Sequence, residues 1–256
     1  MSHRDRLTQG VPLLAYACAF VWALAALSCA TSAEAATVSA LTPTLAPARL
    51  GAKAKLTLAV RFAGEGQPVP SPLKRAQVML PAGMTLDVPS LKSCARKRLL
   101  EHGPGACPQL SRVGYGRAVT IARTGSQLIQ EHVTLSVFVG PLAVQGPTLE
   151  VYGRGFTPIE QRQVFTGTVL PAEAPFGEEL SLPLPPIHTL ELEPDASMEL
   201  LSLTIGTGLT HHGHAGAAMS VPRHCPPTGF PFAAEFAYAD GTTSTAQATI
   251  PCPSTD

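Results

Sequence analysis

Residues 230–250 read FPFAAEFAYADGTTSTAQATI, and the spacing of their apolar side chains indicates how this chain folds. Apolar residues occupy every second position on both sides of an Asp-Gly pair: Phe230, Phe232, Ala234, Phe236 and Tyr238 before it, and Ala246, Ala248 and Ile250 after it. A period of two is typical of a β-strand with one buried face. Because Asp240-Gly241 favours a tight turn, the stretch predicts a β-hairpin.

The same alternation recurs through the chain. It is clearest at 56–62, 133–139 and 201–205, and weaker strands are expected near 74–80, 113–122, 148–153, 162–170, 188–193 and 216–222. The 25 prolines and 22 glycines suit short strands joined by turns. We therefore predict an all-β fold, an antiparallel immunoglobulin-like β-sandwich with one short helix.

Residues 36–256 are predicted to form a single domain. Strand character is weakest at 170–186, LPAEAPFGEELSLPLPP. This segment is either an internal domain boundary or a loop packed over the sandwich.

The first 35 residues have the pattern of a signal peptide. Arg4 and Arg6 precede an apolar run from Val11 to Ala30, and Ala33-Glu34-Ala35 forms an A-x-A cleavage site. The protein is therefore expected to be secreted or held in the cell envelope. Two alternatives remain open: an uncleaved membrane anchor, since the run is long enough to span a bilayer, and a lipid attached to Cys29.

Four cysteines follow the signal segment: Cys94, Cys107, Cys225 and Cys252. In an exported protein they suggest two disulfides, and three pairings are possible. We favour Cys94–Cys107 and Cys225–Cys252, because each pair brackets a compact local unit. Neither spacing matches the short C-x₂₋₄-C pairs of zinc sites.

The first cysteine pair encloses the expected short helix. Ser93 is a candidate N-cap, Gly103 a candidate end, and Pro104 would prevent continuation. Lys92, Arg96, Lys97 and Arg98 lie on or beside this helix. They are expected to form a solvated basic face, with contact to an anionic envelope polymer as the alternative.

Charge argues against a nucleic-acid partner. Lys+Arg and Asp+Glu both number 18, and only 14% of residues are charged, whereas nucleic-acid binding needs a basic footprint. The chain contains no Asn. Abundant Pro, Gly, Ala and Arg with scarce Lys and no Asn is typical of a GC-rich, bacterial genome.

Recognisable catalytic patterns are missing from the sequence. It has no nucleophile elbow, phosphate-binding loop, H-E-x-x-H zinc motif or calcium loop. Glu178-Glu179 and Glu191 with Glu193 are candidate glycosidase carboxylates, although Glu191 and Glu193 fit the solvent face of a strand better. We expect no cofactor, and we interpret the glycines at 114, 116, 206 and 208 as turn or bulge residues.

A histidine cluster is the one unusual group. His211, His212 and His214 lie close together, with Met219 and His224 nearby. Imidazoles so close could bind Cu(II), Ni(II) or Zn(II). The alternative is a polar loop between strands.

Several short motifs together resemble a group of secreted, uncharacterised β-sandwich proteins of soil actinobacteria. The resemblance covers roughly residues 70–253 and rests on LPAG at 80–83, CP at 107–108, SRVG at 111–114, GPL at 140–142, FTGT at 165–168, PFG at 175–177, PDA at 194–196, CP at 225–226, GFPF at 229–232 and PCP at 251–253. It implies export, disulfides and a β fold. It implies no catalytic residues.

These observations predict an exported, non-catalytic binding or structural module of the cell envelope with an unknown ligand. Contact with a membrane is expected only through an uncleaved N-terminal segment. Two alternatives come from other classes: an extracytoplasmic transition-metal binder that uses the histidine cluster, and a hydrolase without a recognisable motif.

Overall fold

The structure is a computed structural model. It describes residues 36–64, 69–86, 92–157, 160–188, 195–206, 210–211, 214–215 and 219–253. These ranges fall within one compact unit, residues 34–256. The predicted signal segment, residues 1–35, lies outside them, and the first described strand begins at Ala36, directly after the predicted cleavage site.

Nearly all regular structure in the described ranges is antiparallel β-sheet. The large sheet consists of β1 (Ala36–Ala46), β2 (Lys53–Gly64), β3 (Leu73–Pro81), β4 (Thr85–Leu86), β5 (Arg112–Thr124), β6 (Gln127–Val139), β7 (Thr148–Gly155), β8 (Gln161–Pro171), β9 (Phe176–Pro183), β10 (Ser197–Ile205), β13 (Met219–Ser220), β14 (Phe230–Tyr238) and β15 (Thr243–Ile250). A separate pair consists of β11 (Thr210–His211) and β12 (His214–Ala215). The prediction of an antiparallel all-β fold is confirmed.

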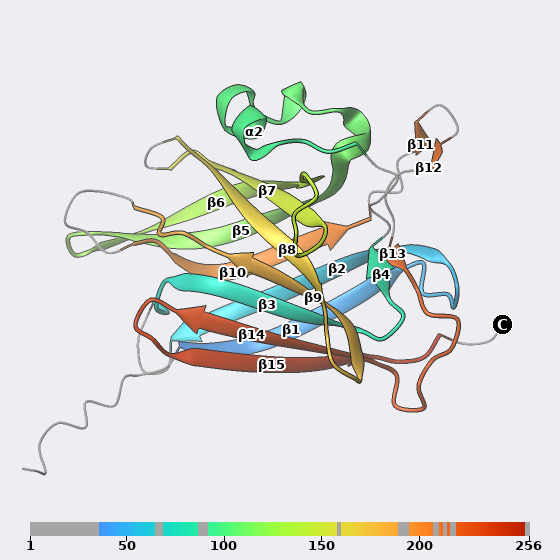
Figure 1. The fold of residues 1–256 in the computed structure, drawn as a ribbon. Helices are drawn as coiled ribbons and strands as arrows, with labels where there is room; N and C mark the ends of the chain where they lie inside the picture. Colours follow the sequence, from blue (N-terminus) through green and yellow to red (C-terminus); the bar gives the residue numbers. More distant parts are fainter. Residues whose placement is uncertain are drawn as a thin grey trace, which may run out of the picture. The chain divides into compact units, whose positions relative to one another are not determined.

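The large sheet curves back on itself. Its hydrogen-bonded path runs β15-β14-β3-β9-β8-β7-β6-β5-β10-β2, and β1 pairs with β2. β1 and β15, the strand at the other end of this path, lie side by side (Figure 1). One continuous curved sheet therefore surrounds the core, and the immunoglobulin-like arrangement of two sheets stays a prediction.

The hydrophobic core is formed by side chains on the inner face of this curved sheet. Alternate residues of β2 and β14 point inward and are buried, as the period of two predicts. Phe62 and Phe236 meet edge to face at the centre, with their ring centroids 5.0 Å apart. This part of the interior is packed with large side chains.

Two long strands, β1 and β9, were not expected from the sequence, and neither were the two-residue strands β4, β11 and β12. β1 was overlooked, and β9 occupies the segment 170–186 that was interpreted as a boundary or loop. β9 lies between β3 and β8 and pairs with both. Its flanking prolines and its Glu178-Glu179 pair obscured the inward alternation of Leu180 and Leu182.

Two other predicted strands are not fully described. Most of 188–193 lies outside the described residues, and so do residues 216–218 of the expected strand at 216–222. The described remainder of that second segment contains the short strand β13.

The predicted short helix is α2 (Arg96–His102), and it packs against β8 (Figure 1). Gly103 ends it as expected, with its N–H donating to Leu99 O at 2.9 Å. The prediction of Ser93 as the N-cap is wrong, since the N-cap is Ala95. The helix starts late because the preceding backbone is tied to β6 by a 2.8 Å hydrogen bond from Cys94 N to Val139 O.

Both expected disulfides are present, Cys94–Cys107 and Cys225–Cys252. The first joins the residues on either side of the segment that contains α2. The second closes the loop that contains the hairpin of β14 and β15, whose register pairs Phe230 with Ile250. Disulfides of this kind form and persist in oxidising surroundings, outside the cytoplasm.

Two of the expected turn or bulge glycines, Gly114 and Gly116, lie in β5, where it pairs with β10. A register irregularity separates Arg112 from Gly114, as the bulge interpretation predicts. A Cβ atom at Gly114 would lie 2.5 Å from Thr204 O, so the backbones of β5 and β10 approach too closely for any side chain. Of the other pair, Gly206 directly follows β10 with φ of 90°, and Gly208 lies outside the described residues.

Candidate ligand-binding cavity

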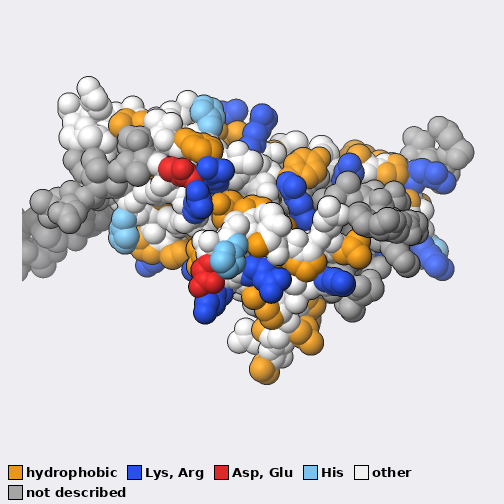
Figure 2. Space-filling view, turned by 90° about the horizontal axis from the view of Figure 1, so that it is seen from above, with side chains coloured by type: hydrophobic (Ala, Val, Ile, Leu, Met, Phe, Trp, Pro, Cys, Tyr) orange, Lys and Arg blue, Asp and Glu red, His pale blue; other side chains and the backbone are white. Residues whose placement is uncertain are grey.

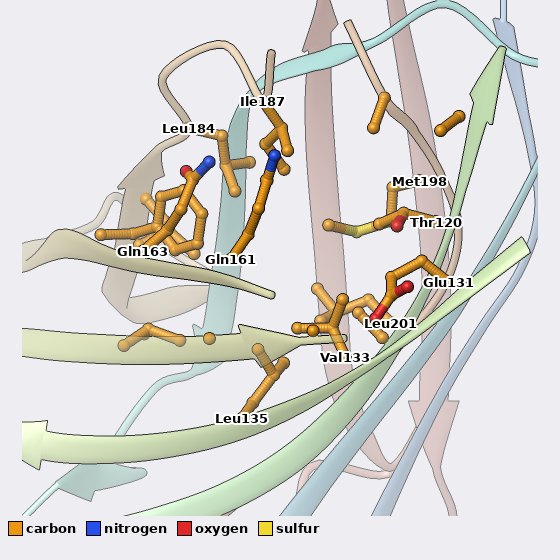
Figure 3. Close-up of a pocket in the computed structure, with 18 of the residues that line it drawn as sticks. Thr120, Glu131, Val133, Leu135, Gln161, Gln163, Leu184, Ile187, Met198 and Leu201 are labelled. Carbon is orange, nitrogen blue, oxygen red and sulfur yellow. The ribbon is translucent and has the colours of Figure 1, made fainter. Parts of the chain in front are cut away.

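A cavity opens on the inner face of the sheet, between the strands β5 to β10. It lies toward the β5–β6 turn, and β5, β6, β7, β8, β9 and β10 all contribute lining residues (Figure 3). The cavity volume is about 90 Å³, several times the ~10–15 Å³ that one water molecule needs. The space therefore suits a slender organic molecule.

The hollow exists because small residues occupy inward positions on neighbouring strands. Ala118 and Ala122 on β5 and Gly153 and Gly155 on β7 line it. A Cβ atom at Gly153 would make ordinary contacts, 3.4 Å from atoms of Leu135 and Val133. In the packed part of the core, by contrast, inward positions of β14 carry Phe230, Phe232 and Phe236.

Most of the lining is apolar. β6 contributes Val133 and Leu135, β8 contributes Phe165, and β10 contributes Met198 and Leu201. Val133 and Leu135 share the inner face through the alternation of β6. On β10, a register irregularity between Met198 and Leu200 lets Met198 and Leu201 line the same cavity. Such a surface is unfavourable to expose to water and favours an apolar occupant.

Glu131 is the only ionisable side chain among the described lining residues. It is 8% exposed. Its Oε1 accepts a hydrogen bond from the backbone N–H of Phe156, which holds the carboxyl group in place. Its Oε2 is buried and has no hydrogen-bond partner within the described part of the chain.

Neutral polar groups complete the lining. Thr120 lies near Glu131, and Gln161 and Gln163 lie across the cavity from it (Figure 3). Gln161 Nε2 donates to His188 O at 2.9 Å. This bond anchors the connection between β9 and β10 at the rim of the cavity.

The rim has two further ties. Ala196 N donates to Ile187 O at 2.9 Å, and His188 Nδ1 lies 2.7 Å from Asp195 Oδ1. Ile187 and Ala196 both line the cavity. The described residues on either side of 189–194 are therefore held together where they meet the cavity.

Glu150 is a second buried carboxyl group, on β7 outside the cavity lining. Burial raises its pKa, although the hydrogen bond from Thr166 Oγ1 (2.8 Å) and the positive charge of Arg96 act in the opposite direction. The folded protein therefore holds this proton to a higher pH than the unfolded chain does.

Replacing Glu150 with glutamine should change how stability depends on pH. In the wild type the unfolded chain ionises first, so Glu150 lowers the free energy of unfolding as pH rises from about 4.5 to the raised pKa. The Glu150→Gln variant lacks this decrease and should gain stability relative to wild type across that window. Urea titrations at several pH values measure the difference, with the exposed Glu173→Gln as control. Equal pH profiles for the two variants would contradict the prediction.

The predicted histidine site cannot be compared with the structure at side-chain level. His212 lies outside the described residues, and for His211 and His214 only the backbone is described, which pairs them across β11 and β12. Among the side chains that are described, no three His, Cys, Asp or Glu residues come together as a potential metal site. The histidine site therefore stays a prediction.

Of the two candidate carboxylate pairs, Glu178-Glu179 does not converge on one site. Glu178 and Glu179 are neighbours on β9, so they point to opposite faces of the sheet. Glu179 Oε1 accepts from Gln77 Nε2 at 2.6 Å, and burial raises the pKa of Glu178. Glu191 and Glu193 lie outside the described residues.

The basic residues beside α2 are exposed. Lys97 Nζ lies 3.8 Å from Glu101 Oε1. Exposed ion pairs of this kind contribute little to the free energy of unfolding. Figure 2, seen from the α2 side, shows Lys and Arg side chains spread among uncharged and hydrophobic ones. The arrangement agrees with a solvated helix face.

Sequence reasoning missed the cavity and Glu131. One signal was present: Glu131 continues the inward alternation of Val133, Leu135, Val137 and Val139 toward the start of β6. A carboxyl group at an inward position of a strand is costly to bury unless it is paired or hydrogen-bonded, so it marks a candidate site.

Within the described ranges, no helix has the length and apolar character needed to cross a membrane. Comparison of the chain with protein-family models, with curated proteins and with solved structures found no match. The resemblance to secreted actinobacterial proteins therefore stays a prediction.

Proposed function

We propose that this chain is an exported, non-catalytic binding protein that holds a small, mainly apolar ligand in the cavity between β5 and β10. The observation that carries the proposal is a cavity with apolar walls and one fixed carboxyl group. Concave, mostly apolar sites with a few placed polar groups are typical of small-molecule binding.

Binding is favoured over hydrolysis because of what lines the cavity. Acid–base or nucleophilic hydrolysis uses at least two converging reactive groups. Among the described lining residues, the only polar side chains besides Glu131 are two neutral amides and two threonine hydroxyls.

Export is part of the proposal. Residues 1–35 have a charged start, an apolar run and an A-x-A site, and the two disulfides favour oxidising surroundings. The protein would then meet its ligand outside the cytoplasm, as a secreted or envelope protein.

A cavity-filling substitution tests the proposal. We expect 1-octanol, a neutral probe with a slender apolar chain, to bind the wild-type protein in a calorimetric titration. Gly153→Leu should weaken octanol binding at least tenfold, because its side chain occupies the hollow beside Leu135 and Val133. Excluding two methylene groups at about 0.8 kcal/mol each is enough for that loss.

Gly105→Leu is the matched control. Gly105 lies in the turn after α2, and nothing approaches its Cβ position within 4 Å. This variant should bind octanol as the wild type does. No octanol binding by the wild type, or equal binding by all three proteins, would overturn the proposed function.

A further inference from the structure

We propose that the ligand is an amphiphilic amine, an apolar chain that ends in a primary ammonium group received by Glu131 Oε2. This inference rests on the proposed function and identifies the chemistry of the ligand. It starts from Glu131 Oε2, which has no hydrogen-bond partner among the described residues and belongs to a side chain that is 8% exposed and lines the cavity.

The carboxyl group of Glu131 is oriented for this contact. The backbone N–H of Phe156 engages Oε1, and Gly155 leaves room for that oxygen, since a Cβ atom there would lie 2.5 Å from it. Within the described part of the chain, one oxygen is thus fixed and the other has no donor. A buried acceptor without a donor is unfavourable, and a ligand that supplies a donor removes that cost.

An ammonium group suits Oε2 better than a hydroxyl group. No Lys, Arg or His is present among the described lining residues, so no cation of the protein neutralises the carboxylate inside the cavity. Charge-assisted hydrogen bonds are about twice as strong as neutral ones. Apolar walls strengthen the attraction further, because they lower the local dielectric.

The strand geometry also gives the ligand a direction. Glu131, Val133 and Leu135 are successive inward residues of β6, and Glu131 is nearest the β5–β6 turn. Four residues of a strand span about 13 Å. An extended chain of about eight carbons fits this span, with its ammonium group at Glu131 and its tail toward Leu135.

The test compares three probes that share one alkyl chain: 1-octylamine, 1-octanol and octanoate. Calorimetry on the wild-type protein at neutral pH should show octylamine binding about tenfold more tightly than octanol, and octanoate more weakly than either. Glu131→Gln should weaken octylamine binding at least tenfold, more than it weakens octanol binding, and so remove the preference for octylamine over octanol.

Two further variants guard against a simple folding defect. Gly155→Ala keeps the carboxyl group but forces it to move, so it should also reduce the preference for octylamine over octanol. The exposed Glu173→Gln changes charge by the same amount as Glu131→Gln and should keep the wild-type preference.

The outcomes separate the two proposals. If neither octanol nor octylamine binds, the proposed function itself fails. If octanol binds and Gly153→Leu weakens it, but octylamine binds no more tightly than octanol, the amine inference fails and the proposed function stands. The inference also fails if the preference for octylamine survives in Glu131→Gln.

Discussion

Replacing Phe236 with alanine should lower the free energy of unfolding by about 3–5 kcal/mol. Phe236 is fully buried in β14 and packs edge to face against Phe62 on β2, with ring centroids 5.0 Å apart. β2 and β14 are not hydrogen-bonded to each other, so this contact joins two strands through the core. Urea unfolding followed by circular dichroism measures the loss.

Phe156→Ala is the control for the loss of an aromatic ring. Phe156 is 56% exposed, and its ring lies 4.5 Å from the guanidinium of Arg154. Its removal should cost about 0.5–1 kcal/mol, the usual size of an exposed cation–π contact. Equal losses for the two variants would contradict the view that large aromatic side chains hold this part of the core together.

The contrast between this packed region and the cavity is a property of the sequence. Inward positions of β14 carry phenylalanine and tyrosine, whereas inward positions of β5 and β7 carry alanine and glycine at the cavity. Large inward side chains fill the space inside the curved sheet, whereas small inward side chains leave part of that space empty. The tightly packed core and the cavity therefore occupy different parts of one sheet.

Local features of the fold could be predicted from the sequence. The hairpin of β14 and β15 is encoded by alternation on both sides of Asp240-Gly241. The Asp240 side chain supports the turn by accepting from Thr242 N at 2.9 Å. The pairing of the cysteines was predictable for the same reason, because each disulfide closes a segment that already folds on itself.

Strand order and the cavity could not be predicted, because they depend on contacts between distant segments. The place of β9 between β3 and β8 is set by partners in both directions along the chain. Likewise, Gly153 and Ala118 border one cavity only after β6 has placed β5 and β7 on either side of it. Period-two alternation tells which residues face inward, but it does not tell which residues they face.

The disulfide between Cys225 and Cys252 links the hairpin's stability to the oxidising surroundings expected for this protein. The loop it closes contains β14, and β14 supplies Phe236 to the core and pairs with both β3 and β15. Without the cross-link, the hairpin's 27-residue loop gains freedom in the unfolded chain. Reduction of this disulfide should therefore lower the free energy of unfolding of the protein.

Replacing both Cys225 and Cys252 with serine should lower the free energy of unfolding by about 3.5 kcal/mol on the chain-entropy account. The same change at Cys94 and Cys107, which are 13 residues apart, should cost about 0.6 kcal/mol less, because the shorter loop restricts the unfolded chain less. Urea unfolding of both double variants measures the two losses. Dithiothreitol should lower the stability of the wild type by breaking both disulfides, whereas in each double variant it can break only the disulfide that remains. If the Cys225/Cys252 variant unfolds at the wild-type urea concentration, the hairpin is held by core packing alone, and the case for an oxidising compartment loses its energetic support.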